Sequence, residues 1–419
     1  MPEITETSLG YRIAYDNLKL TITISRIHLH KDGRMTAEFL IETTAPGYSP
    51  LLHQSQINLL STRSRQSLCK ELETRYEAPW PEILEQACAA ILDRVRKGEP
   101  VQFISTFDDN IEPPQYLIEP LLPLRQPTAI FGLPGTMKSY MAILCSIITS
   151  LPWHDNPFGL KASTESHLAL YLDYESSKEL MTWRLKKLQR GLELPDLIIP
   201  YRRCALPLAE DINTIKKLIE ETKAKFLIID SIGGACGGDL YAPEPVLQFF
   251  AALRTLNLTT LILAHTSKEN AKEKSILGSV YWTAYSRQIF QSLVSHEANE
   301  NEISIGLFHR KSNEDKLFPP IGFHFFFDES LIRVEREDVK GVAGLLEHLA
   351  LSQKVLEILK EGSMTLAEIA DSLETRKDTI AITLSRLKNK GQVTKLGEKK
   401  WGLSASLSKL PLSNFNHPA

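Results

Sequence analysis

Residues 128–139 read Thr128-Ala-Ile-Phe-Gly132-Leu-Pro-Gly135-Thr-Met-Lys138-Ser139, and the rest of the chain can be interpreted around them. They predict a short apolar strand, a glycine-containing loop and a helix that begins near Lys138. Such a loop wraps a polyphosphate with backbone N–H groups and places it at a helix N-terminus, where the helix dipole favours anions. We expect the Lys138 ammonium to reach the β- and γ-phosphates and the Ser139 hydroxyl to bind Mg²⁺.

One position departs from the usual form of this phosphate-binding loop. Met137 stands where a glycine usually precedes the lysine, whereas Gly132 keeps the six-residue offset from Lys138. The alternative is a glycine-rich turn that joins a strand to a helix by chance. The residues expected to hold the nucleotide, ATP, are Gly132, Pro134, Gly135, Thr136, Met137, Lys138, Ser139 and Tyr140.

Length and composition limit the remaining possibilities. The chain has 419 residues, which predicts two or three domains. Its formal net charge is −3, so any contact with nucleic acid must come from local basic patches. The 5 cysteines are scattered without a Cys-x-x-Cys pair, which argues against a disulfide framework or a zinc site. Without a visible signal peptide or a long apolar run, we expect a cytoplasmic protein with no membrane partner.

Four segments are expected along the chain. Residues 1–110 predict a small α+β domain, because alternating apolar residues flank Asp32-Gly33, a hairpin signal, and helices are expected over 61–75 and 81–97. We interpret it as an interaction or oligomerisation module, with DNA contact as the alternative. The six prolines of 100–127 predict an extended linker. Three units follow, namely an ATPase domain over 111–340, a small domain over 350–404 and a flexible tail over 405–419.

Further apolar segments predict strands of the same sheet as the loop. They cover residues 167–175, 225–231 and 259–265 and alternate with amphipathic segments that predict helices. Unbroken apolar strands between helices indicate a parallel sheet covered on both faces, so the fold class is α/β. Two last strands, over 302–308 and 322–327, are expected to close the sheet on its far side.

Charged side chains stand at the carboxyl ends of these strands, where such sheets bind their ligands. Asp230 is expected to hold Mg²⁺, and Glu175 to polarise the water that attacks the γ-phosphate. His265 is expected to sense that phosphate and to relay its loss. The alternative for each residue is a strand-end side chain that caps a neighbouring helix.

The chain from about residue 116 to 330 resembles the RecA-like ATPases of the RepA, DnaB and KaiC group, and most closely the RepA-like replication helicases of plasmids and phages. The segments that carry the resemblance are Gly132-Leu-Pro-Gly-Thr-Met-Lys-Ser139, Leu170-Tyr-Leu-Asp-Tyr-Glu175, Leu227-Ile-Ile-Asp-Ser231, Leu263-Ala-His-Thr266, Gly278-Ser279 and His309-Arg-Lys-Ser-Asn313.

The resemblance implies an assembly as well as an activity. In this group the catalytic glutamate lies on the strand after the phosphate loop, which the position of Glu175 fits. Its members form rings with ATP between neighbouring subunits, and a basic residue of the neighbour completes each site. We therefore expect a homo-oligomer, a hexamer, that uses ATP and Mg²⁺. By position Lys311 or Arg310 resembles the trans-acting group, with Arg287 as a weaker candidate.

Two loops would face the centre of such a ring. Residues 233–241 contain four glycines, which suggests mobility. Residues 267–275 carry Lys268, Lys272 and Lys274, which are expected to bind the phosphates of a DNA single strand. Because two glutamates lie between these lysines, a solvated polar loop is the alternative.

Residues 350–404 resemble a winged helix-turn-helix domain. A capping box begins a short helix at Thr365, a second helix covers 378–388, and the segment 391–403 predicts a two-stranded wing that turns at Gly397. The basic residues expected to contact duplex DNA include Lys377, Lys388, Lys399 and Lys400. A winged helix that contacts protein instead is the alternative.

The leading hypothesis is a DNA-dependent ATPase, a ring-forming helicase of a mobile element, phage or plasmid. A second hypothesis is a KaiC-like oligomeric switch or DNA-binding regulator that uses ATP without moving along DNA. A third is an ATP-driven loader for another enzyme.

Overall fold

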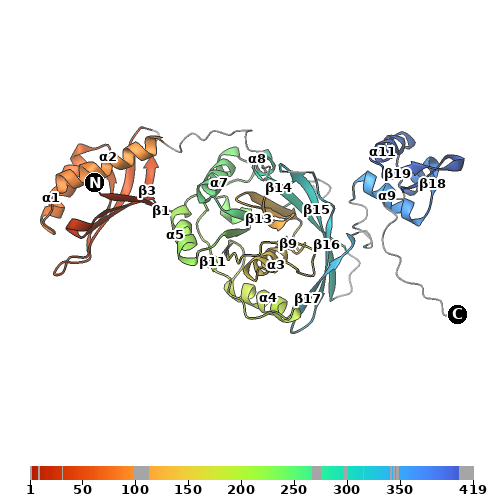
Figure 1. Cartoon of the computed structure of the whole chain (residues 1–419), viewed down its shortest axis with the longest axis horizontal. Coiled ribbons are helices and arrows are strands. Elements are labelled where there is room, and N and C mark those ends of the chain that lie inside the picture. Colours follow the sequence, from red (N-terminus) through yellow and green to blue (C-terminus); the bar gives the residue numbers. More distant parts are fainter. Residues whose placement is uncertain are drawn as a thin grey trace.

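The computed structural model describes residues 2–7, 10–30, 32–97, 113–266, 275–295, 301–314, 316–339, 342, 345 and 349–404. Its elements fall into three groups along the chain, which Figure 1 shows as three separate bodies. The domain boundaries 1–110, 111–340 and 350–404 stay predictions. The tail over 405–419 lies outside the described residues. Among the described helices, none combines the length and the apolar character that crossing a membrane requires.

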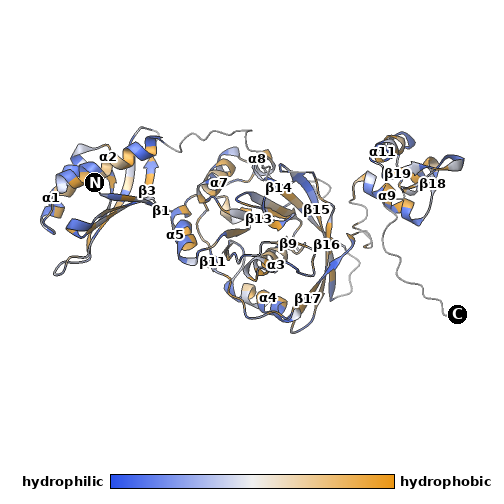
Figure 2. Ribbon diagram, viewed as in Figure 1, coloured by the Kyte–Doolittle hydropathy of each residue, from blue (hydrophilic) through white to orange (hydrophobic). Residues whose placement is uncertain are grey.

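The first group is an antiparallel meander, in the order β1-β2-β3-β4-β5, with two helices on one face. The pairing of β3 with β4 confirms the predicted hairpin. The two helices also lie within a residue or two of where the sequence placed them, and in Figure 2 both carry apolar and polar residues. The elements are β1 (Glu3–Thr7), β2 (Gly10–Tyr15), β3 (Leu20–Leu29), β4 (Met35–Thr43), β5 (Leu51–Asn58), α1 (Thr62–Glu73) and α2 (Trp80–Lys97).

The central group is an α/β unit built on a sheet in the order β11-β10-β12-β13-β8-β14-β15-β16-β17. Strands from β11 to β14 run parallel, and β15 to β17 continue the sheet antiparallel. The strands are β8 (Pro127–Gly132), β10 (Ala169–Asp173), β11 (Tyr201–Arg203), β12 (Phe226–Asp230), β13 (Thr259–His265), β14 (Gln288–Val294), β15 (Glu302–Ser312), β16 (Ile321–Phe327) and β17 (Ile332–Glu337).

Helices cover both faces of this sheet, as the unbroken apolar strands predict. In β12, Ile228 packs into the cluster with α3 and α4, while its neighbour Ile229 packs into the cluster with α5, α6, α7 and α8. Successive side chains of a strand point to opposite faces, so each strand contributes to both cores. The helices are α3 (Lys138–Ser150), α4 (Lys178–Gly191), α5 (Ile212–Thr222), α6 (Ile232–Ala235), α7 (Pro243–Leu256) and α8 (Val280–Tyr285).

Several details differ from the sequence predictions. Part of the segment predicted as a linker forms strands instead, because its prolines lie at strand ends: these are β6 (Tyr116–Glu119) and β7 (Leu122–Pro123), which join β9 (Lys161–Ala162) in a small sheet. Strand β14 was not predicted, although it lies directly beside β8. The glycine-rich segment after β12 begins as the short helix α6 rather than as a loop.

The third group has the element order expected for residues 350–404, with a helix, a helix pair and a terminal strand pair. A capping box at Thr365 begins α10, as predicted. The identification as a winged helix stays a prediction. The elements are α9 (Leu351–Glu361), β18 (Met364–Thr365), α10 (Leu366–Ser372), α11 (Lys377–Asn389), β19 (Val393–Lys395) and β20 (Lys400–Leu403).

Candidate active site

The loop between β8 and α3 is held in a shape that leaves little room for side chains. A Cβ on Gly132 would lie 2.5 Å from the carbonyl oxygen of Ser292 on β14, so only glycine fits there. Gly135 has φ of +81°, and Met137 has φ of +62°. A left-handed conformation costs a residue with a Cβ about 1–3 kcal/mol. The buried packing of the Met137 side chain offsets part of that cost, which explains why a glycine is usual at this position and why methionine still fits.

Lys138 begins α3 and is buried, with 7% of its surface exposed. Its Nζ donates to the carbonyl oxygens of Leu133, at 2.8 Å, and Gly132, at 3.2 Å, both in the same loop. Burial lowers the pKa of Lys138 to about 8, against the opposing effect of the Asp230 and Glu175 charges. The side chain is therefore a cation held among neutral oxygens, and an anion in the loop would stabilise its charged form.

Asp230 ends β12 next to the start of α3. Its carboxylate is 5% exposed, and it accepts hydrogen bonds from the Tyr171 hydroxyl, at 2.6 Å, and from Ser139. Burial raises the pKa of Asp230, and these two hydrogen bonds oppose that rise. Ser139 and Asp230, each predicted to bind Mg²⁺, are therefore hydrogen-bonded to each other. Because Tyr171 comes from the neighbouring strand β10, it fixes where the carboxylate points.

Glu175 lies just beyond β10 and meets side chains from the next two strands. It accepts a hydrogen bond from the Ser231 hydroxyl, after β12, and His265 Nε2, at the end of β13, lies 3.2 Å from its Oε1. The hydrogen bond from His265 is the largest cause that lowers the pKa of Glu175 to about 2, and the one from Ser231 adds to it. Both partners meet Oε1, so Oε2 can accept a hydrogen bond from a water molecule.

Asp173 holds this arrangement in place. It is 1% exposed, and its Oδ1 accepts from the backbone N–H groups of Glu175, at 2.9 Å, and Ser176, at 2.7 Å. The Tyr201 hydroxyl on β11 donates to its other oxygen at 3.0 Å. Asp173 therefore shapes the turn that carries Glu175, and the two acids at this strand end have different roles.

The residues around the loop suit a Mg²⁺–nucleotide. Lys138 is a buried cation without a carboxylate in direct contact among the described residues, and Ser139 and Asp230 offer two oxygens that already face each other. No cluster of three or more His, Cys, Asp or Glu side chains in the described ranges could hold a metal alone. A Mg²⁺ here would take its remaining ligands from phosphate oxygens and water, as Mg²⁺ usually does.

The other residues predicted to bind the nucleotide differ in where their side chains lie. Pro134 and Gly135 form the exposed tip of the loop, and Thr136 is buried beneath it, with its carbonyl accepting from Ser292 Oγ at 2.6 Å. Tyr140 faces away from the loop, because its ring packs edge-on against Phe325 and Phe327 on β16. Only the backbone of Tyr140 can therefore contribute to the loop.

The predicted trans-acting residues do not join this cluster. Lys311 Nζ donates to the carbonyl oxygens of Thr283, at 2.6 Å, and Ser286, at 2.7 Å, at the end of α8. Arg310 donates to Gln291 at 2.9 Å, and burial lowers its pKa to about 10. Arg287 is exposed just before β14.

The predicted DNA-binding lysines fall in two places. Those expected in a central loop, Lys268, Lys272 and Lys274, lie outside the described residues. In the last group Lys377 begins α11 and Lys388 lies near its end, both exposed, while Lys399 is exposed in the turn before β20 and Lys400 begins that strand.

The family match found by comparison with known proteins lies mostly on the central group. Residues 93–271 match a family described as an AAA domain. No curated protein sequence matches the chain. A KaiC-like protein from the hyperthermophilic archaeon Pyrococcus horikoshii OT3 is a structural neighbour with 15% identity and a TM-score of 0.37, covering 52% of this chain and 93% of its own. The domain match and the cluster around the loop support a RecA-like P-loop ATPase.

Proposed function

We propose that this chain is an ATP-hydrolysing, DNA-binding motor of the RecA type, acting as a ring-forming helicase similar to the RepA-like enzymes. The observation that supports it most is the convergence of Lys138, Asp230 and Glu175 at the carboxyl ends of parallel strands, with Ser231 and His265 bonded to the glutamate. Packing alone does not require ionisable groups at or just beyond the ends of β8, β10, β12 and β13 to meet at one edge.

Each residue has a definite task in this proposal. The loop amides and Lys138 bind the phosphates, and Glu175 Oε2 orients the water in line with the bond to be broken. Water attacks the γ-phosphorus, the bond to the ADP oxygen breaks, and the proton of the water leaves through Glu175. Mg²⁺, held by Ser139 and Asp230, would neutralise negative charge on the phosphate oxygens.

His265 links the phosphate to the rest of the proposed motor. Its Nε2 lies 3.2 Å from Glu175, and its backbone carbonyl accepts from the N–H of Leu277 at 3.1 Å. Residue 277 follows the segment with Lys268, Lys272 and Lys274. Loss of the γ-phosphate would change the contacts of His265, and that change would reach Leu277 through this backbone hydrogen bond.

The first test is steady-state ATP hydrolysis by the full chain with and without single-stranded DNA. We expect stimulation of several-fold, because a motor couples hydrolysis to its track. If DNA leaves the rate unchanged while duplex binding is intact, the result favours the oligomeric switch or regulator instead. Sizing with ATP and DNA, separately and together, then shows whether a ring assembles.

The second test separates binding from hydrolysis. Glu175→Gln is expected to keep ATP bound but to reduce hydrolysis about 100-fold or more, since it removes the group that orients the water. Lys138→Ala is expected to abolish nucleotide binding or turnover. Glu179→Gln is the matched control, because Glu179 is an exposed acid on the adjoining helix α4. Wild-type turnover in Glu175→Gln would remove Glu175 from the mechanism.

A further inference from the structure

A second pocket lies at the amino-terminal edge of the parallel strands, opposite the phosphate loop. Its cavity is about 470 Å³, and its walls come from the turn before β8, the end of α7, the start of β13 and the end of α8. Gln126 and Thr260 stand at the strand starts that form its floor, joined by a backbone hydrogen bond of 3.2 Å. Gly132 and His265 end the same two strands, so the pocket and the active site lie at opposite ends of β8 and β13.

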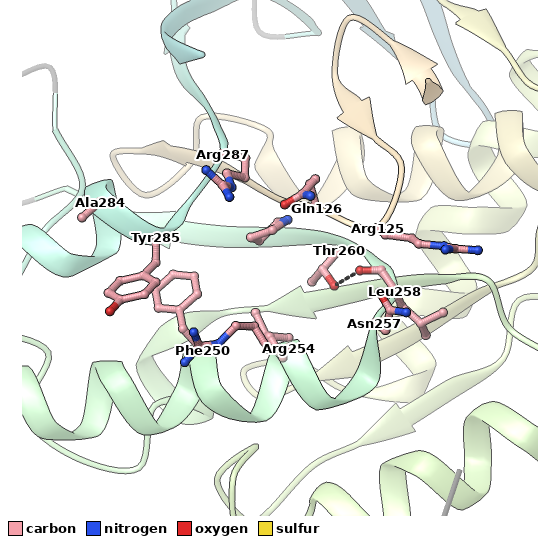
Figure 3. Close-up of a pocket in the computed structure, with 12 residues that line it drawn as sticks. Arg125, Gln126, Phe250, Arg254, Asn257, Leu258, Thr260, Ala284, Tyr285 and Arg287 are labelled. Carbon is pink, nitrogen blue, oxygen red and sulfur yellow. Dashed lines mark hydrogen bonds between the residues drawn. The ribbon is translucent and has the colours of Figure 1, made fainter. Parts of the chain in front are cut away.

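Three arginines and no acidic residue line this pocket. Arg125, Arg254 and Arg287 are each exposed, and among the ion pairs between described residues none involves these three side chains. Figure 3 shows Arg287 on one wall, Arg254 on the opposite wall and Arg125 at the far end beside Asn257. Like charges in one cavity repel each other, so an anion between them would be stabilised.

The backbone that carries two of these arginines is anchored. The N–H of Arg125 donates to Thr259 Oγ1 at 2.8 Å, and the N–H of Arg287 donates to the carbonyl oxygen of Pro127 at 2.9 Å. The guanidinium groups therefore extend from fixed points on the sheet. Such an arrangement suits phosphate, which guanidinium groups bind through paired N–H donors.

One wall is aromatic. The rings of Phe250 and Tyr285 are stacked, with centroids 5.4 Å apart and an angle of 24° between them. The Arg254 guanidinium lies 5.9 Å from the centroid of the Tyr285 ring. Phe250 is 2% exposed, and the half-buried Tyr285 lies beside it and also lines the cavity.

We propose that this pocket binds a nucleotide unit, with its phosphate between Arg254 and Arg287 and its base against Tyr285. A cavity of this volume falls in the range of small-ligand sites, about 300–1,000 Å³. The combination of guanidinium groups and an aromatic face matches a charged phosphate joined to a flat base. The ligand is a free nucleotide or the phosphorylated end of a strand. This site lies at the opposite end of the parallel strands from the phosphate loop of the same chain.

The experiment uses the full chain carrying Lys138→Ala, which is expected to remove nucleotide binding at the phosphate loop. Calorimetric titration measures the affinity for ADP, for a 5′-phosphorylated thymidine dinucleotide and for the same dinucleotide without the 5′-phosphate. We expect the 5′-phosphate to strengthen dinucleotide binding at least tenfold. Tighter binding of ADP identifies a free nucleotide as the ligand, and tighter binding of the phosphorylated dinucleotide identifies a strand end.

Variants then locate the binding. Adding Arg254→Gln and Arg287→Gln to the Lys138→Ala chain is expected to weaken binding of the phosphorylated probe at least tenfold. Arg333→Gln, which changes an exposed arginine on β17, is the matched control. Tyr285→Phe is expected to keep the affinity and Tyr285→Ala to reduce it. Unchanged thermal unfolding of the arginine variants shows that they fold.

Three outcomes would overturn the proposal. The first is an affinity for the probes that the arginine variants do not change. The second is no binding of either phosphorylated probe at millimolar concentration. The third is that the arginine variants change only the oligomeric state, which would mean that acidic groups of another copy occupy the pocket. None of these outcomes affects the ATPase proposal, because its readout is hydrolysis at the phosphate loop.

Discussion

Nucleotide binding by this protein should take up protons at alkaline pH, because Lys138 is buried as a partly neutral amine. Its pKa is lowered from 10.5 to about 8 by burial, so about half of the side chains are neutral at pH 8 and about nine in ten at pH 9. Phosphates in the loop favour the charged form and return the pKa toward its usual range.

The size of the effect follows from these two states. Binding of Mg²⁺–ADP should take up about 0.1 proton at pH 7, about 0.5 at pH 8 and about 0.9 at pH 9. The dissociation constant should rise about tenfold between pH 7 and pH 9, a loss of about 1.4 kcal/mol. The direction of both effects is fixed. Raising the pH neutralises Lys138 in the free protein, and nucleotide binding must then restore its proton.

Calorimetry in two buffers of different ionisation enthalpy gives the number of protons directly. ADP is preferred as the ligand because it is not hydrolysed and still places a β-phosphate at the loop. Lys138→Arg should abolish the uptake, since a guanidinium stays charged throughout this range. Lys217→Arg, on the exposed side of α5, should leave it unchanged. An uptake below about 0.1 proton at pH 9 would refute the account of Lys138 as a buried, partly neutral amine.

Three further changes test other contacts. Gly132→Ala should abolish ATP binding without unfolding the protein, since the new Cβ would lie 2.5 Å from the Ser292 carbonyl oxygen and must shift the loop; equilibrium binding with circular dichroism checks this. Ser231→Ala should slow hydrolysis about tenfold at unchanged ATP affinity, because it removes one hydrogen bond that orients Glu175, and single-turnover kinetics measure it. Lys388→Ala should weaken duplex DNA binding and reduce the salt slope of log K by about 0.9 if this lysine contacts a phosphate, which titrations at several salt concentrations measure.

The parts of the fold that the sequence predicts are those with local signals. The loop, the strand ends and the helices of the first group carry short patterns of apolar residues, glycines and caps. The same is true of Glu175, Asp230 and His265, since topology brings the carboxyl ends of neighbouring parallel strands together. Their mutual contacts could be expected from strand order, although no motif gives that order.

The parts that escaped prediction depend on residues distant in the chain. Ser292 supports the loop from β14, a strand that mixes polar and apolar residues and therefore lacks the unbroken apolar pattern of its neighbours. The apolar neighbours of Tyr171 indicate only a core residue, whereas in the structure its hydroxyl donates to Asp230, 59 positions away. The sequence predicts that Tyr140 helps to bind the nucleotide because it directly follows the motif, but its position on α3 directs its ring toward β16.

The position of Lys311 bears on whether one chain can complete its own active site. Lys311 pairs with Ile289 on β14, which pairs with Ala129 on β8, three residues before the end of that strand at Gly132. At about 3.3 Å per residue, Lys311 therefore lies about 10 Å behind the loop along the strand direction. Its Nζ is held still further toward the amino-terminal edge by the carbonyl oxygens at the end of α8.

Lys311 therefore cannot reach a phosphate bound by the loop of its own chain. The surroundings of its ammonium group also disfavour the charged form. Burial and the charge of Arg287 both lower the pKa of Lys311. If Lys311 acts on ATP at all, the ATP must belong to another copy, so Lys311→Ala should reduce hydrolysis only under conditions in which the protein assembles. Mixing the Lys311→Ala chain with the Glu175→Gln chain tests whether Lys311 acts on the ATP of another copy. If it does, the mixed assembly recovers activity at sites that combine the intact Lys311 of one chain with the intact Glu175 of the other. No recovery in assembled mixtures would show that Lys311 supports the end of α8 and takes no part in hydrolysis.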